Sequence, residues 1–119
     1  MKKIFIYTIL FLISANVYSQ KSSEKISKSV IKVLGNCESC KKRIENAADI
    51  KGVKNAIWDE KTETLTVIFR SDKTSLSQIE KAIAAVGHDT ENLKAENTTY
   101  QGLPACCKYR EGECTEKGK

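Results

Sequence analysis

The sequence predicts an α+β fold whose elements follow the order strand, helix, strand, strand, helix, strand. Three observations support this order. Apolar and polar residues alternate over residues 65–69, apolar residues recur at helical spacing over residues 76–86, and a second helical pattern begins at a Cys37-x-x-Cys40 pair. Two strand–helix–strand halves in tandem form a four-stranded antiparallel sheet with both helices on one face.

The first strand and helix lead into and out of the cysteine pair. Residues 27–34 place Ile31 and Val33 on one face and lysines on the other, which is typical of a half-buried strand. The helix over residues 38–48 places Ile44 on the same face as Cys40, and Gly52 lies just past its end.

The middle of the domain reads as a hairpin. Residues 53–58 are predicted to form a strand with Ala56 and Trp58 facing the core, and the polar residues 59–63 form a turn. Residues 65–69 are the clearest strand of the chain, because three apolar side chains alternate with polar ones.

The second helix has the strongest start and stop signals. Ser75 and Gln78 form a capping box, and Gly87 ends the helix. Its apolar face consists of Leu76, Ile79, Ile83 and Val86. Residues 88–94 then leave room for one short edge strand. The sequence therefore predicts a ferredoxin-like βαββαβ sandwich over residues 26–95.

The N-terminus has the pattern of a secretory signal peptide over residues 1–19. Lys2 and Lys3 precede an apolar stretch of ten residues, and Val17 and Ser19 are small residues at the −3 and −1 positions of a cleavage site. Ten apolar residues are too few to span a membrane, which takes about 20. We expect a periplasmic or secreted protein without a stable membrane anchor, whose domain follows a linker over residues 20–25.

Charge and motif content exclude several function classes. Removal of residues 1–19 lowers the formal net charge from +5 to +3, and acids and bases are interspersed, so nucleic acid is not an expected partner. The sequence has no Ser/His/Asp set and no phosphate-binding loop, and its one histidine has no evident acid partner. We therefore expect no enzymatic activity.

The cysteine pair has two main chemical interpretations. With Cys40 in the first helical turn and Cys37 in the loop before it, both sulfurs face one side. The helix start and the cations Lys41, Lys42 and Arg43 are expected to favour thiolates there. Such a pair either holds a soft metal ion or cycles through a disulfide, and a module with structural cysteines is a third alternative.

Residues 26–95 resemble the heavy-metal-associated domain, the family of copper chaperones, the cytosolic arms of copper-pumping ATPases and periplasmic mercuric-ion binding proteins. The resemblance covers the whole predicted domain through Val33, the cysteine loop and four further stretches, which are residues 41–48, 52–59, 65–67 and 79–89. One departure is plain. The family usually has Gly-Met-x-Cys-x-x-Cys, whereas Gly35-Asn36-Cys37 lacks the methionine that packs beneath the loop.

The resemblance implies a metallochaperone or scavenger that holds one soft ion at an exposed site and passes it on by ligand exchange. Two thiolates suit Cu(I) above all, or Hg(II), whereas Zn(II) prefers four ligands. The implied partner is a metal-donor or metal-acceptor protein, such as a metal-transporting membrane pump.

Four further residues are candidate ligands. His88 follows the second helix and is expected either to bind or support the metal or to act as an ordinary loop residue. Cys106, Cys107 and Cys114 lie in a polar tail over residues 96–119, where they bind metal, form a disulfide or belong to a tail that does neither. An extended chain covers about 3.3 Å per residue, so this tail is long enough to fold over the cysteine loop and admit Zn(II).

Overall fold

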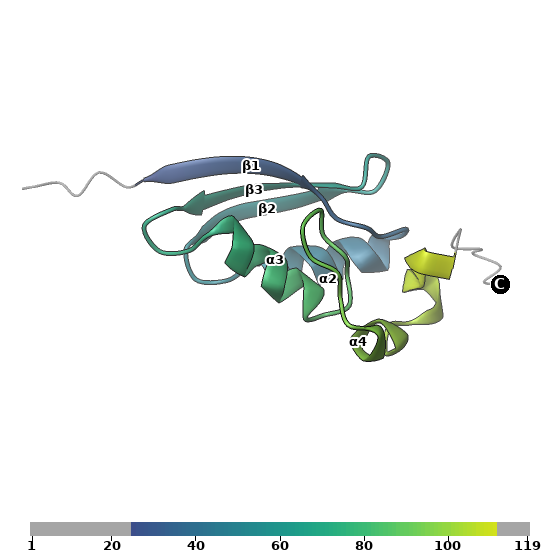
Figure 1. Ribbon diagram of the computed structural model, residues 1–119. Coiled ribbons are helices and arrows are strands. Elements are labelled where there is room, and N and C mark those ends of the chain that lie inside the picture. Colours follow the sequence, from purple (N-terminus) through teal and green to yellow (C-terminus); the bar gives the residue numbers. More distant parts are fainter. Residues whose placement is uncertain (1–24, 112–119) are drawn as a thin grey trace, which may run out of the picture.

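The computed structural model describes residues 25–111, so the predicted signal peptide, most of the predicted linker and Cys114 lie outside the described residues. The elements are β1 (Ile26–Lys32), α2 (Glu38–Ala48), β2 (Val53–Asp59), β3 (Thr64–Arg70), α3 (Leu76–Ala84), α4 (Asn97–Gln101) and the 3-10 turns Ala105–Cys107 and Tyr109–Glu111 (Figure 1).

The sheet has the strand order β1-β3-β2, and both pairings are antiparallel. Helices α2 and α3 lie against the same face of this sheet (Figure 1). The core between the sheet and the helices contains side chains that the sequence predicted to face inward. The strands and the residue after β1 contribute Ile31, Val33, Trp58, Leu65, Val67 and Phe69, and the helices contribute Ile44 and Ile79. The bounds of α2 and the Ser75 cap, whose hydroxyl accepts a hydrogen bond from the Gln78 amide, confirm the helix predictions.

The predicted fourth strand is wrong for the described residues. Residues 88–94 form no strand and pair with the chain just after β1 through one isolated bridge between Val33 and Thr90. The Thr90 amide donates to the Leu93 carbonyl at 2.7 Å, which closes a turn. The buried carboxylate of Glu80 holds this turn against α3, accepting hydrogen bonds from the Thr90 hydroxyl and from the amide and side chain of Asn92. These local bonds replace the ladder that a strand would need.

Residues 96–111, which we call the C-terminal segment, are folded against the domain. The segment lies beside the N-terminal end of α2 (Figure 1), and it buries Tyr100, Leu103 and Cys107. The sequence showed little apolar periodicity here because the buried side chains come from α4, the bend after it and the 3-10 turn Ala105–Cys107 rather than from one long helix.

Gly87 provides the surface on which the C-terminal segment packs. Its φ is +103°, a conformation that favours glycine, and a Cβ atom at this position would lie 3.0 Å from the Leu103 side chain. Leu103 therefore occupies the space that any other residue at position 87 would fill. Gly87, which the sequence predicted to end the second helix, therefore also provides the surface that Leu103 contacts.

Polar contacts at residues 87–89 hold the end of the C-terminal segment. The Tyr109 hydroxyl donates to the Gly87 carbonyl at 2.7 Å and accepts from the Asp89 amide at 2.8 Å. Burial raises the pKa of Tyr109 to about 12, so the hydroxyl keeps its proton. Arg110 pairs with the Asp89 carboxylate at 2.6 Å and lies over the Tyr100 ring.

The burial pattern of α2 generates a stability prediction. Ile44→Asp places an unpaired carboxylate in the core, so we expect the free energy of unfolding to fall by at least about 3 kcal/mol. Lys42→Asp changes an exposed side chain on the same helix and should cost less than about 1 kcal/mol. Urea unfolding of both variants checks this, and equal midpoints would show that the helix faces are wrongly assigned.

The Asp89–Arg110 pair generates a pH prediction. Burial alone raises the pKa of Asp89, but hydrogen bonds from Arg110 and the Ala95 amide outweigh it, and the net pKa is below its ordinary value. A depressed folded pKa stabilises the fold above the unfolded pKa of about 3.9, and this contribution is lost as pH falls through the folded value.

Asp89→Asn should therefore lower the free energy of unfolding by about 2 kcal/mol at pH 7, with the difference from wild type shrinking below about pH 4. Urea titrations between pH 2.5 and 7 measure it. The exposed residue Glu91 provides the control Glu91→Gln, which should match wild type throughout. If the free energy of unfolding of Asp89→Asn were lower than that of wild type by the same amount at every pH, the ion pair would not be the cause of the difference.

Candidate metal centre

The two cysteines of the loop lie at the start of α2 as predicted. Cys37 is the N-cap in extended backbone conformation, and its carbonyl accepts a hydrogen bond from the Lys41 amide. Cys40 lies in the first turn. The two Sγ atoms are 3.3 Å apart and both residues are thiols, so the sulfurs share one side as the spacing indicated.

The loop before Cys37 is supported by Trp58 from β2. A Cβ atom on Gly35 would lie 2.9 Å from the Trp58 ring, so the glycine allows the loop to contact the indole closely. The indole Nε1 donates to the Val33 carbonyl at 2.9 Å. The sequence lacks the family's methionine, but the loop has a buried aromatic support. The sequence predicted that Trp58 faces the core, but it did not predict that Trp58 supports the cysteine loop.

A third sulfur joins the pair from the C-terminal segment. Cys107 Sγ lies 3.6 Å from Cys37 Sγ, and the sulfurs of Cys37, Cys40 and Cys107 all lie within 4.8 Å of one another. Among the described residues, this is the one group of three candidate ligands. All three side chains are buried, with 9%, 0% and 0% exposure. The expectation of an exposed site is therefore wrong, because the segment covers it.

The other tail cysteines differ in position. Cys106 is half-buried, and its Sγ lies 3.9 Å from Cys107 Sγ. Cys114, the third cysteine predicted as a candidate ligand in the tail, lies outside the described residues.

The expected stabilisation of thiolates is wrong for Cys40. Burial raises the pKa of the Cys40 thiol well above its ordinary value, and the neighbouring Cys107 and Cys37 thiols add to the increase. A helix start stabilises an anion by about 1 kcal/mol, whereas removal of a charge from water costs several. Cys40 is therefore a protonated thiol at neutral pH, and an ion that binds it must displace the proton.

The cation that reaches the sulfurs is Arg43. Its Nη1 donates to Cys107 Sγ at 3.4 Å. Lys41 instead donates to the Trp58 carbonyl and pairs with Glu45, and Lys42 is exposed. Arg43 follows Cys40 by three residues, so helical spacing places it on the same face and could have indicated its role.

His88 lies beneath the loop. Its Nδ1 is 2.9 Å from the Leu34 carbonyl, so this nitrogen carries the proton and donates. Within residues 25–111 the buried Nε2 has no hydrogen-bond partner, and burial lowers the pKa of the imidazole. The ring stacks on Tyr109 at 5.3 Å. His88 is not part of the group of three sulfurs, and its contacts join the loop to the C-terminal segment.

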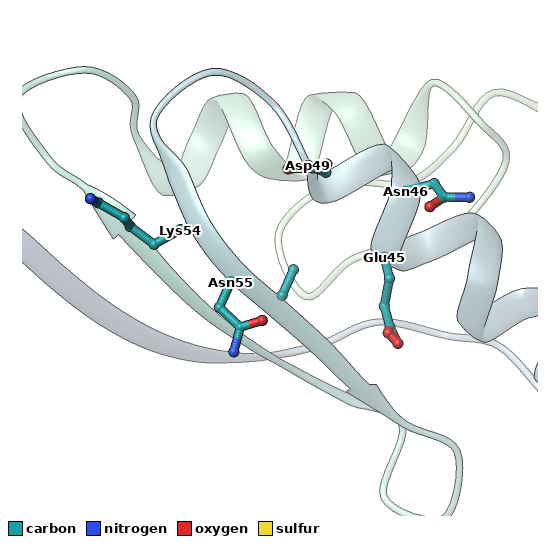
Figure 2. A pocket seen from close by; sticks show the side chains of 6 residues that line it. Glu45, Asn46, Asp49, Lys54 and Asn55 are labelled. Carbon is teal, nitrogen blue, oxygen red and sulfur yellow. The ribbon is translucent and has the colours of Figure 1, made fainter.

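A polar pocket elsewhere on the surface has different chemistry. It lies between α2 and β2, and Figure 2 shows Glu45, Asn46, Asp49, Lys54 and Asn55 around it. Its carboxylate and amide oxygens suit harder ions than sulfur does. Among residues 25–111, no helix combines the length and apolar character needed to cross a membrane.

The family model of the heavy-metal-associated domain matches residues 36–89. Among solved structures, the CopZ metallochaperone is 30% identical with a TM-score of 0.52, and the match covers 54% of this chain and 98% of CopZ. A comparison with curated protein sequences found no significant match.

Two further structures are similar. The N-terminal domain of a potential copper-translocating P-type ATPase from Bacillus subtilis, in the Cu(I)-loaded state, is 30% identical with a TM-score of 0.52 over 55% of this chain and 84% of that one. Oxidized MerP from Ralstonia metallidurans CH34 is 25% identical with a TM-score of 0.53 over 56% and 94%. These matches span about half of this chain.

The raised pKa of Cys40 predicts low reactivity. In the reduced protein at pH 7.5, iodoacetamide should alkylate Cys40 at least about tenfold more slowly than the half-buried Cys106, because only the thiolate attacks. Mass spectrometry of peptides over time measures both rates. In urea the two rates should converge. Faster alkylation of Cys40 in the folded protein would contradict its assignment as a buried thiol.

Proposed function

Because the chain belongs to the heavy-metal-associated domain family, we propose that it is a carrier or scavenger of a soft metal ion, exported from the cytoplasm. Cys37 and Cys40 hold the ion and release it to a second protein by ligand exchange. The observation that supports this most directly is the pair of thiols 3.3 Å apart at the start of α2.

Cu(I) is the proposed ion. Sulfur ligands prefer soft ions, and no carboxylate joins the cluster among the described residues. The similar structures include a metallochaperone and a Cu(I)-loaded ATPase domain, which agree with this choice. Hg(II) suits the same two ligands. Zn(II) prefers four ligands and is the weaker candidate.

The proposed partner is a metal-transporting membrane pump or another metal-binding domain. One of the similar structures is a domain of a P-type ATPase, which supports this choice. Export is proposed from residues 1–19, whose basic, apolar and small-residue regions have the pattern of a signal peptide. Periplasmic or secreted location would expose the thiols to oxidants, and their burial under the C-terminal segment would protect them.

A thiol-disulfide enzyme is the rival from another class. The proximity of the Cys37 and Cys40 sulfurs would allow a disulfide to form after a small movement. Catalytic exchange, however, needs an accessible thiol, whereas the side chains of Cys37 and Cys40 are both buried, with 9% and 0% exposure. The geometry therefore favours a metal carrier.

Substitution of the pair tests the proposal. The double variant Cys37→Ser, Cys40→Ser should bind Cu(I) at least about a hundredfold more weakly than wild type, because hydroxyl oxygens are poor ligands for a soft ion. Anaerobic titration against a Cu(I) chelator measures the affinity. Thr98→Ser, a change at an exposed residue, is the control. Wild-type affinity in the double variant, or steady disulfide turnover by wild type, would contradict the carrier function.

A further inference from the structure

We propose that Cys107 is a third thiolate ligand, so that the C-terminal segment completes a three-sulfur site for a soft metal ion. The inference rests on the proposed function of Cys37 and Cys40 and adds a ligand, a coordination number and a cover to that site. The family model ends at residue 89, so it says nothing of Cys107.

The positions of the sulfurs suit three-fold coordination. Three sulfurs that each lie about 2.3 Å from one ion stand about 4 Å from one another. The sulfurs of Cys37 and Cys40 are 3.3 Å apart, those of Cys37 and Cys107 are 3.6 Å apart, and all three lie within 4.8 Å of one another. Shifts of less than 1 Å therefore bring all three to an ion between them.

Contacts on both sides of Cys107 fix its position. Before it, Leu103 packs on Gly87, and the Cys107 amide donates to the Pro104 carbonyl at 2.8 Å. After it, Tyr109 is bonded to the backbone at residues 87–89, and Arg110 pairs with Asp89. The sulfur of Cys107 is thus held over the loop by packing and hydrogen bonds that need no metal.

The charge near Cys107 fits a thiolate at this position. When Cu(I) binds three thiols, three protons pass to the solvent and the complex has a net charge of −2. The Arg43 guanidinium, 3.4 Å from Cys107 Sγ, offsets part of this charge. If only Cys37 and Cys40 bound the ion, Cys107 would remain a neutral thiol, and the Arg43 guanidinium beside it would offset no thiolate charge there.

A third ligand from a separate segment changes how the ion leaves. With Cys107 bound, an acceptor protein reaches the ion only after the C-terminal segment moves away from α2. The ion is therefore held more tightly and released more slowly than by the cysteine loop alone.

The coordination number can be measured directly on the full chain. X-ray absorption of the anaerobic Cu(I) complex should count three sulfurs in wild type, two in Cys107→Ser and three in the neighbouring control Cys106→Ser. Cys107→Ser should also bind Cu(I) at least about tenfold more weakly and transfer it to a chelator at least about tenfold faster than Cys106→Ser.

Each outcome supports or overturns the proposal. Two sulfurs in wild type would overturn it without any variant, and so would loss of the third sulfur in Cys106→Ser rather than in Cys107→Ser. Thermal unfolding shows whether each variant is folded. Failure here is distinct from failure of the carrier function, because Cys37→Ser, Cys40→Ser would still abolish tight binding if only the third ligand were absent.

Discussion

The contact between Trp58 and the cysteine loop joins the sheet to the site. The indole lies against Gly35, and its Nε1 holds the Val33 carbonyl at the point where β1 ends. Trp58 itself is fixed by its register with Leu65 on β3. The direction of the loop, the start of α2 and the positions of both loop sulfurs follow from this buried contact. A substitution in the sheet core that moves Trp58 therefore also moves the cysteine loop.

The parts that sequence predicted well depend on local patterns. Alternation over residues 65–69, the Ser75 cap and the face shared by Cys40 and Ile44 are properties of short stretches, and each agrees with the structure. The pairing of two cysteines three residues apart is equally local, since one helical turn places them together. These patterns give three strands, both long helices and two of the three sulfurs.

The features that the sequence did not predict depend on contacts between residues far apart in the chain, and short sequence patterns do not indicate such contacts. Residues 88–94 are long enough for one short edge strand, but Glu80 on α3 holds them as a turn. The pKa of Cys40 rises because the sheet and a segment more than 60 residues away exclude water, which outweighs the helix start. Leu103 and Cys107 lack periodicity because they pack from separate turns. Sequence could show that the tail can reach the loop, but not where it docks.

The distance along the chain between Cys37 and Cys107, 70 residues, has a consequence for biosynthesis. A ribosome makes the cysteine loop well before the residues that cover it, and a loop of this length closes only after Cys107 has been made. A chain that does not yet include Cys107 therefore has two uncovered loop sulfurs, and a chain that includes the C-terminal segment encloses them. The order of synthesis thus separates an open form of the cysteine loop from a covered one.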